Sequence, residues 1–545
     1  MIINTSLDCV LITVVRKMQV PVVSEGRWPI LGHAVAMGKN PMAYFRRCYE
    51  EYGPIFEINL LGYRMVVVCD RKLYREYTAI DEMKQENKDG KGKGTLSIYK
   101  FFDFAYLDNP YIDTSHSSLC KITQASVIRA VADISHAATT DVWHSLQTGI
   151  TVLVSSINDA RGLNESVFRY SVHTCSVHYF GYVPTSSCLD DLYAFSKLMD
   201  KLTSNVFTLP RFLAKYWYAP SLKLFQQKIL QHLSAHLDVS DHPMILKLKE
   251  LASSLLFNNS NNANSATSEE DEDNVGSDDD NTSDNEDYDD DNTDGETRDD
   301  VVKKFVVGVY LAMVMAGSPN TAMGVTDAII ELAYDNSCLD RVRNEVATTF
   351  QRYEECVRRG ETCENAGLLN SQLLNNIVWE TARLYPSLFG SVRMVTEPNS
   401  DEPVMVGPYN VSQAFAVVCM SALITNDSDL FPDPTTFNPD RFSETMGCKY
   451  INQIPMWGTN GDETDGSVGV GRVSVGYNSN TNKHACPGIE LSTKQMMLAI
   501  ATIAYYFNVE KSLSTAAMSS KPDINYITTT TFATRNVSLQ LSGRI

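Results

Sequence analysis

A cysteine placed to act as a thiolate is the most chemically telling residue of this chain. Cys486 lies in the string Lys-His-Ala-Cys-Pro-Gly over residues 483–488, directly before apolar residues at helical spacing. A thiol at a helix N-terminus meets free backbone N–H groups and the positive end of the helix dipole, which both favour the thiolate. Such a thiolate can bind a soft metal or haem iron, attack a carbon centre, or be purely structural.

Two motifs upstream carry charged side chains. Glu380 and Arg383 lie one helical turn apart in the string Glu-Thr-Ala-Arg, so they share a helix face. An isolated pair at this spacing is usually a surface salt bridge that contributes little. The later string Phe-Asn-Pro-Asp-Arg-Phe over residues 437–442 contains Arg441. The order of these motifs along the chain decides between the options for Cys486.

In that order, and with His484 two residues before the cysteine, the motifs resemble those of the cytochrome P450 family. The resemblance implies a mainly α fold with small β-sheets, built around a buried haem b. It also implies that Cys486 is the axial iron ligand, that His484 faces a haem propionate, and that Gly488 allows close backbone approach. Electron donation from a thiolate ligand favours cleavage of the O–O bond.

The resemblance also assigns a supporting role to the charged motifs. Glu380, Arg383 and Arg441 would form the three-member ion network of the family. Such a network supports the haem-binding core and takes no part in the chemistry.

Within the family, sterol 14α-demethylases resemble this chain most. Residues 29–41 and the string Tyr-Gly-Pro at 52–54 look like that branch. Arg393 stands at the distance from Glu380 where the branch places a propionate-binding arginine, although a lone arginine in a strand typically faces solvent. Tyr99, in a segment that loosely resembles the substrate-recognition loop, matches a tyrosine that contacts the haem in the branch.

The loop before the cysteine departs from the family pattern. Ser479 replaces the usual phenylalanine, and Asn482 replaces a glycine. Asparagine is among the best non-glycine residues for a left-handed backbone, so the shape of the loop can survive. A hydrogen bond from Ser479 toward the sulfur would raise the potential of the iron.

A second departure concerns the residues expected to face bound oxygen. The string at 316–321 is Ala-Gly-Ser-Pro-Asn-Thr, whereas oxygen-activating members resemble Ala-Gly-x-acid/His-Thr. Ala316 and Gly317 would leave room above the haem. Proline cannot donate a hydrogen bond and should kink the helix, and Asn320 is no acid. Either Asn320 or Thr321, the latter through a shift of register, would order water beside oxygen.

The sequence therefore favours a haem-thiolate monooxygenase that oxidises a hydrophobic sterol-like or lipid substrate. No flavin or Rossmann signature is visible, so electrons would come from a separate NADPH-P450 reductase or a ferredoxin. Loss of the proton-relay residues leaves open an isomerase or dehydratase that rearranges lipid hydroperoxides. A diverged haem or lipid binder and a thiol enzyme without haem are further alternatives.

The amino-acid composition limits which partners and which cellular compartment are expected. The net charge is −20, and Glu269 to Asp300 contribute −17 of it, so an electrostatic nucleic-acid footprint is not expected. The 12 cysteines show no Cys-x-x-Cys pair and no regular disulfide spacing, which fits a reducing compartment. We expect a monomer.

The N-terminal segment, residues 1–24, shows no clear transmembrane anchor. Its apolar run ends at Arg16 and is far shorter than the roughly 20 residues that span a bilayer. We therefore expect a cytoplasmic protein, or one with peripheral contact to an intracellular membrane.

The rest of the chain divides into one fold and an insertion. We expect residues 25–257 to form the first part of the P450 domain and residues 301–545 its haem-binding part. Residues 258–300 are rich in Asn, Ser, Asp and Glu and cannot bury enough apolar surface to fold, which predicts a disordered insertion. Phe305 to Gly317 are apolar on nearly every face and predict a core helix.

Several elements can be placed from pattern. We expect a helix from Pro41 to about Tyr52, a β-hairpin over 55–69, and helices from about 118 to 250 with breaks near 184–187 and 209–220. Strands are expected within 402–424 and 524–542, and a buried helix after Cys486.

Overall fold

The structure is a computed structural model. It describes residues 18–39, 41–80, 95–105, 142–204, 211–257, 297–360, 367–386, 391–396, 403–443, 486, 488–511, 525–526, 533–534 and 539–544. His484, Ser479 and Asn482 lie outside these residues, and so do residues 258–296 of the expected insertion. The predictions for them stay predictions.

The described chain is mainly helical with small sheets, which confirms the predicted fold class. Its helices are α1 (Ala34–Lys39), α2 (Pro41–Tyr52), α3 (Arg71–Ala79), α4 (Ile98–Ala105), α6 (Val142–Asn158), α7 (Leu163–Phe180), α8 (Ser186–Ser204), α9 (Arg211–Val239), α10 (Pro243–Phe257), α12 (Arg298–Tyr334), α13 (Asn336–Arg359), α14 (Gln372–Leu384), α15 (Ser421–Ile424) and α17 (Ile489–Tyr506), with 3₁₀ turns η3 (Leu368–Asn370) and η4 (Pro439–Phe442).

The strands are β1 (Ile55–Leu60), β2 (Tyr63–Val68), β3 (Thr95–Ser97), β4 (Ser391–Thr396), β5 (Met405–Val406), β6 (Tyr409–Asn410), β7 (Ala416–Cys419), β8 (Phe507–Lys511), β9 (Asn525–Tyr526), β10 (Ala533–Thr534) and β11 (Leu539–Gly543). Five of them form one sheet in the order β1-β2-β7-β4-β3, and the others pair as two-stranded ribbons. The β2–β7 pair is parallel, and the other neighbours in the large sheet are antiparallel.

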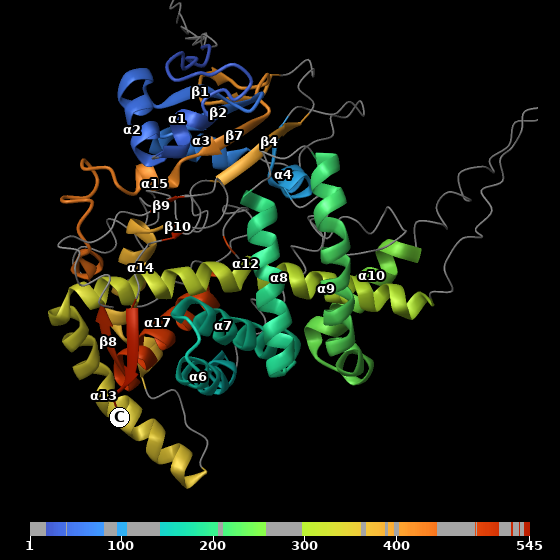
Figure 1. The fold of residues 1–545 in the computed structure, drawn as a ribbon, viewed down its shortest axis with the longest axis vertical. Helices are drawn as coiled ribbons and strands as arrows, with labels where there is room; N and C mark the ends of the chain where they lie inside the picture. Colours follow the sequence, from blue (N-terminus) through green and yellow to red (C-terminus); the bar gives the residue numbers. More distant parts are fainter. Residues whose placement is uncertain are drawn as a thin grey trace, which may run out of the picture.

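The long helix α12 divides the molecule (Figure 1). The large sheet and α1 to α3 lie on one side of it, and α6, α7, α13 and α17 lie on the other. The helices α6 to α10, α12 to α14 and α17 share one apolar core, which includes most of the buried apolar residues of α12. Alternation along the strands gives the sheet two apolar faces, with Val67 in the cluster on one face and Val66 in the cluster on the other.

The predicted hairpin is confirmed and positions the sheet edge. β1 and β2 pair in antiparallel register from Ile55↔Val68 to Leu60↔Tyr63. The two residues between them, Leu61 and Gly62, both have positive φ, of 53° and 94°. Two-residue hairpin turns of this kind match the twist of the strands, and glycine adopts the second position without strain.

The predicted core helix is present but is longer than expected. α12 begins at Arg298, inside the segment predicted to be disordered, with Thr297 and Asp300 forming a capping box. The carboxylates of its first turn face the positive end of the helix dipole, which favours this start. The helix then continues through Pro319 to Tyr334, so the proline does not end it.

One predicted helix break is wrong. The break near 184–187 is confirmed, because α7 ends at Phe180 and α8 begins at Ser186. The break predicted near 209–220 is wrong over residues 211–220, because α9 runs from Arg211 through Pro220 to Val239, whereas residues 205–210, after the end of α8, lie outside the described residues. A proline removes one backbone hydrogen bond, and packing of α9 against α8 and α12 outweighs that loss here.

α12 is long and apolar enough to cross a membrane by composition, and no other helix of the described chain is. Of its most apolar window, 61% is buried inside the protein. α12 also packs against α7, α17, α14 and α10. We therefore assign it as the core helix of the fold.

A buried amide fixes the helix that follows Cys486. The Gln495 side chain in α17 donates to the carbonyl of Ser171 (3.3 Å) and to the Thr174 hydroxyl, both in α7. The Tyr170 hydroxyl donates to the backbone carbonyl of Gln495 at 3.2 Å. Since these groups are buried, each bond also prevents an unsatisfied polar atom. α17 is thereby held in one axial position against α7.

We predict that Gln495→Met lowers the free energy of unfolding by about 1–3 kcal/mol, because the carbonyl and hydroxyl acceptors on α7 lose their donor. Urea denaturation followed by circular dichroism measures this. Thr502→Val is the matched control, since within the described part of the chain the Thr502 hydroxyl bonds only the Leu498 carbonyl of its own helix. An equal loss in both variants would show that the link between α7 and α17 adds nothing.

Candidate functional site

Cys486 lies where the sequence places it, three residues before α17. Its carbonyl accepts from the N–H of Ile489 (3.3 Å), in the first turn of the helix. Of the eight cysteines that the structure describes, six are buried, and Cys486 and Cys356 are partly exposed. Cys356 lies near the C-terminal end of α13, whereas Cys486 precedes a helix. Cys486 therefore combines access with a helix N-terminus.

Two opposing effects act on the Cys486 thiol. Burial of the sulfur raises its pKa, and the hydrogen bond from the backbone N–H of Gly488 lowers it. Burial is the larger effect, so the pKa lies above the ordinary value of a cysteine. A backbone N–H at the helix N-terminus does favour the thiolate, as expected, but burial outweighs it in the protein without a bound metal ion. A coordinating metal ion removes a thiol proton outright.

Gly488 meets no steric demand from its described neighbours. Its φ is −89°, which any residue adopts, and a Cβ there would lie 3.9 Å from the Cys486 sulfur, an ordinary contact. Its observed contribution is the N–H that reaches the sulfur. Close approach of its backbone to a haem stays a prediction.

Glu380, Arg383 and Arg441 meet in one buried ion network. The Glu380 carboxylate accepts from Nε and Nη2 of Arg383, both at 2.8 Å, and from Nε of Arg441 at 3.2 Å. The side chains of Glu380 and Arg383 are 0% exposed, and that of Arg441 is 8% exposed. The surface salt bridge, which is the usual reading of such a pair, is therefore excluded.

The guanidinium groups also hold the chain between α15 and η4. Arg383 donates to the carbonyls of Thr425 (3.0 Å) and Pro434 (2.8 Å), and Arg441 donates to the carbonyl of Asp433 (2.7 Å). These carbonyls lie in irregular backbone, where no ladder would satisfy them. The network thus fixes the path of the segment 425–441.

Arg393 is buried in β4 and does not face solvent. Its Nη1 donates to the carbonyls of Tyr77 (3.0 Å) and Ile80 (3.4 Å), and its guanidinium lies 4.6 Å from the centre of the Tyr77 ring. These carbonyls belong to the C-terminal end of α3, where the helix leaves acceptors without partners. The observed role of Arg393 is to cap α3, and its pairing with a propionate stays a prediction.

Tyr99 lies in the first turn of α4, which packs against β4. Its side chain is outside the described part of the structure. Contact between Tyr99 and a haem stays a prediction.

The middle of α12 presents one accessible strip. Ala316 is exposed and Asn320, one turn later on the same face, is partly exposed. Pro319 and Thr321 are buried. Thr321 lies about 100° around the helix from Asn320. It follows Gly317 by one turn, on the face where a Cβ at Gly317 would lie 3.8 Å from the Cys175 sulfur of α7.

Side chains around Pro319 bond back to the helix. Asn320 Nδ2 donates to the Ala316 carbonyl and Thr321 Oγ1 donates to the Gly317 carbonyl, both at 2.8 Å. Asn320 Oδ1 is buried and finds no hydrogen-bond partner among the described residues. Asn320 therefore occupies the position of the threonine in the pattern Ala-Gly-x-acid-Thr. The helix is not shifted in a way that would bring Thr321 onto the accessible strip.

A comparison with protein-family models shows which family this chain belongs to. A family model described as Cytochrome P450 matches residues 22–103 and 165–458, more than half of the chain. This chain belongs to the cytochrome P450 family. Members of this monooxygenase family hold haem through a cysteine thiolate and need a redox partner. The match ends before Cys486, so the assignment of that residue depends on its own motif and geometry.

Curated relatives of this P450 are distant. It is 22% identical over 510 residues to a probable lanosterol 14-alpha demethylase of Acanthamoeba polyphaga mimivirus, which covers 90% of this chain and 58% of the relative. It is 23% identical over 493 residues to cytochrome P450 81F4 of Arabidopsis thaliana, covering 89% and 84%. This chain thus spans less than two thirds of the viral relative's length.

The described residues fit a thiolate-bound haem. Cys486 offers a thiol with a backbone N–H directed to its sulfur, just before a helix held by Gln495. The accessible strip of α12 carries the small Ala316 rather than a bulky side chain. A soft donor of this kind suits iron.

Sequence reasoning missed two contributors. Gln495 was not singled out, although an amide among the apolar residues of α17 is itself a signal of a buried polar contact. The carbonyls of Thr425, Asp433 and Pro434 could not be found from sequence, because every residue has a carbonyl. Their role depends on the path of the backbone.

We predict that Glu380→Gln destabilises this P450 by about 3–5 kcal/mol, because two buried guanidinium groups lose their counter-charge. Thermal unfolding together with the yield of haem-loaded protein measures this. Glu57→Gln is the control, since Glu57 pairs with the exposed Arg64 at 2.8 Å, and should cost less than about 1 kcal/mol. Similar losses in the two variants would contradict the role given to the buried network.

Proposed function

We propose that this P450 is a haem-thiolate monooxygenase in which Cys486 binds the iron and the Ala316–Asn320 strip of α12 lies over the oxygen-binding face. The observation that carries the proposal is Cys486 itself, a cysteine just before α17 with the Gly488 N–H at its sulfur. When bound, the haem would supply the oxidising chemistry. The chain would supply the position of the sulfur, the shape above the haem and the hydrogen bonds beside oxygen.

Asn320 is the residue that we assign to the oxygen side. Its amide is fixed by the Ala316 carbonyl, which leaves Oδ1 to accept a hydrogen bond, for example from an ordered water molecule. An amide can hold and orient water but cannot deliver its own proton at neutral pH. Protons would therefore come from water held at Asn320 rather than from an acid at position 319.

For the substrate, we propose a hydrophobic sterol-like or lipid molecule. The support is the resemblance of residues 29–41 and of the Arg393 context to sterol 14α-demethylases, together with the printed name of the viral relative. Electrons would come from a separate NADPH-P450 reductase or a ferredoxin. Titration of a sterol panel against the Soret band of the ferric protein tests the substrate class.

We predict that Cys486→Ser abolishes the red-shifted Soret band in the carbon monoxide difference spectrum of the reduced protein, because a hydroxyl does not replace a thiolate donor. Cys356→Ser is the matched control, a second partly exposed cysteine that should keep the band. A band that persists unchanged in Cys486→Ser would refute the assignment.

We predict that Asn320→Ala and Thr321→Val act differently. Loss of the Asn320 amide should lower the product formed per electron by about tenfold, the effect of one hydrogen bond of ordinary strength. Thr321→Val should leave that ratio unchanged and cost about 1 kcal/mol of stability, since among the described residues its hydroxyl bonds only the Gly317 carbonyl. Product and NADPH consumption are measured with a reductase. The opposite ranking would assign the oxygen side to Thr321.

A second candidate is rearrangement of lipid hydroperoxides, and Pro319 favours it. Proline has no side-chain acid and no N–H, so the position where oxygen-activating members carry an acid or histidine supplies no proton. A substrate that already contains the O–O bond needs no such supply. Turnover of a lipid hydroperoxide without any reductase would favour this candidate, and turnover only with a reductase would exclude it.

A further inference from the structure

The accessible strip of α12 ends one turn beyond Asn320. Ala316 is exposed and Asn320 is partly exposed, whereas Gly324, one turn further on the same face, is buried. Glycine has no side chain, so a group from another element must cover this position. That group decides how far the space along the strip extends.

The covering group is the side chain of Met496 in α17. A Cβ at Gly324 would lie 2.6 Å from the terminal methyl carbon of Met496 and 3.2 Å from its sulfur. The end of the Met496 side chain therefore occupies the space that a side chain at position 324 would need. Met496 is itself 5% exposed, so it lies between the strip and the helical core.

A second methionine lies on the other flank of this end of the strip. Met323 follows Asn320 by three residues and belongs to the apolar cluster shared with the large sheet, whereas Met496 belongs to the cluster of the helices. The strip thus ends where the two apolar clusters meet. Methionine is unbranched and has three rotatable side-chain bonds, so it fills an irregular gap and adjusts to a neighbour.

The backbone that carries Met496 is held in place. Its neighbour Gln495 donates to the carbonyl of Ser171 at 3.3 Å, and the Tyr170 hydroxyl donates to the carbonyl of Gln495 at 3.2 Å. α17 lies on the side of α12 away from the large sheet (Figure 1) and packs against it. Only the side chain of Met496 is therefore free to adjust to what lies along the strip.

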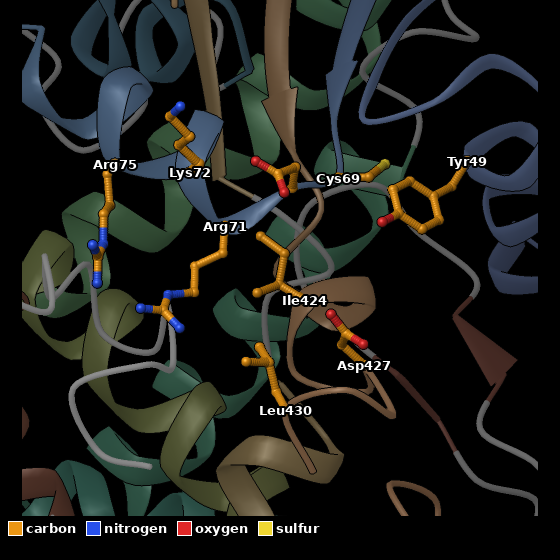
Figure 2. Close-up of a pocket in the computed structure, with 9 residues that line it drawn as sticks. Tyr49, Cys69, Arg71, Lys72, Arg75, Ile424, Asp427 and Leu430 are labelled. Atoms are coloured by element: carbon orange, nitrogen blue, oxygen red, sulfur yellow. The ribbon is translucent and has the colours of Figure 1, made fainter. Parts of the chain in front are cut away.

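Another hollow of the protein lies away from this strip. Figure 2 shows a cavity beside the start of α3, lined by side chains of both charges, such as Arg71 and Asp427. Asp70, which also lines it, caps α3 by accepting from the N–H of Leu73 at 2.9 Å. None of the described residues of α12 or α17 lines this cavity. Selection among molecules that reach the haem would therefore depend on the space along α12.

We propose that Met496 is a specificity-determining residue, whose side chain closes the C-terminal end of the space along the strip and limits the size of a group that fits beyond Asn320. This role rests on the proposed function, because it requires the haem to lie along the Ala316–Asn320 strip. Truncation of Met496 would extend the space as far as Gly324. A methyl group at position 324 would displace the end of Met496 and shorten the space.

Reaction of the ferric, haem-loaded protein with phenyldiazene tests this role, because the reagent places a phenyl group on the iron. Oxidation with ferricyanide then moves the phenyl group to those pyrrole nitrogens of the haem that lie under open space. Chromatography of the extracted haem gives the ratio of the four isomers. The ratio reports the space above each quarter of the haem and needs no turnover.

We expect Met496→Ala to raise the share of one isomer at least about fivefold, because overpacking against a single side chain typically has an effect of this size. Met497→Ala is the matched control. Met497 is the next residue of α17, is 3% exposed and has no atom within 4 Å of a Cβ at Gly324, so this variant should leave the ratio unchanged. Gly324→Ala alters the same contact from α12 and should shift the ratio in the opposite direction.

Two results would overturn the role given to Met496. The first is an unchanged isomer ratio in folded Met496→Ala or in Gly324→Ala, and the second is an equal change in Met496→Ala and Met497→Ala. In both cases the unaltered protein keeps the red-shifted Soret band with carbon monoxide, so the proposed function stands. Absence of that band from the unaltered protein would refute the proposed function itself.

Discussion

The buried carboxylate of Glu380 is the group around which the neighbouring backbone and side chains must be arranged. A fully buried charge is costly unless it is paired and hydrogen-bonded, and Glu380 has four hydrogen bonds: two to Arg383, one to Arg441 and one from the N–H of Asn438. The two arginines in turn need acceptors, which the carbonyls along 425–441 supply. Burial of a single carboxylate therefore dictates the path of a long irregular segment. Such a network is better understood as a source of conformational specificity than of net stability.

In the central helix α12, side-chain hydrogen bonds accompany a proline that interrupts the backbone hydrogen bonding. Pro319 removes one backbone donor, and Asn320 and Thr321 give their side-chain donors to the carbonyls of Ala316 and Gly317. Helical order is kept through the proline, and the accessible strip carries the Asn320 amide one residue later. Pro319 stands where oxygen-activating members carry an acid or a histidine, and its side chain offers no proton. In the proposed function, protons therefore come from ordered water.

Sequence patterns predicted features that are determined locally. The hairpin over 55–68, the helix after Cys486 and the shared face of Glu380 and Arg383 follow from spacing alone. The continuation of α9 through Pro220 was missed, because tertiary packing outweighs one lost hydrogen bond. The contacts of Arg393 were missed for a similar reason. Its partners, the carbonyls of Tyr77 and Ile80, lie more than 300 positions earlier in the chain.

The pKa of the Cys486 thiol separates what the fold does at this site from what a bound metal ion would do. The sulfur is desolvated, and of the groups that act on it only the Gly488 amide lowers its pKa. The fold therefore places the thiol without favouring its ionised form, and in the proposed function metal binding and loss of the proton would be one coupled event. The chain itself fixes the positions of two elements of this half of the protein. Gln495 fixes α17, the helix that follows Cys486, against α7, and the Glu380 network fixes the segment 425–441.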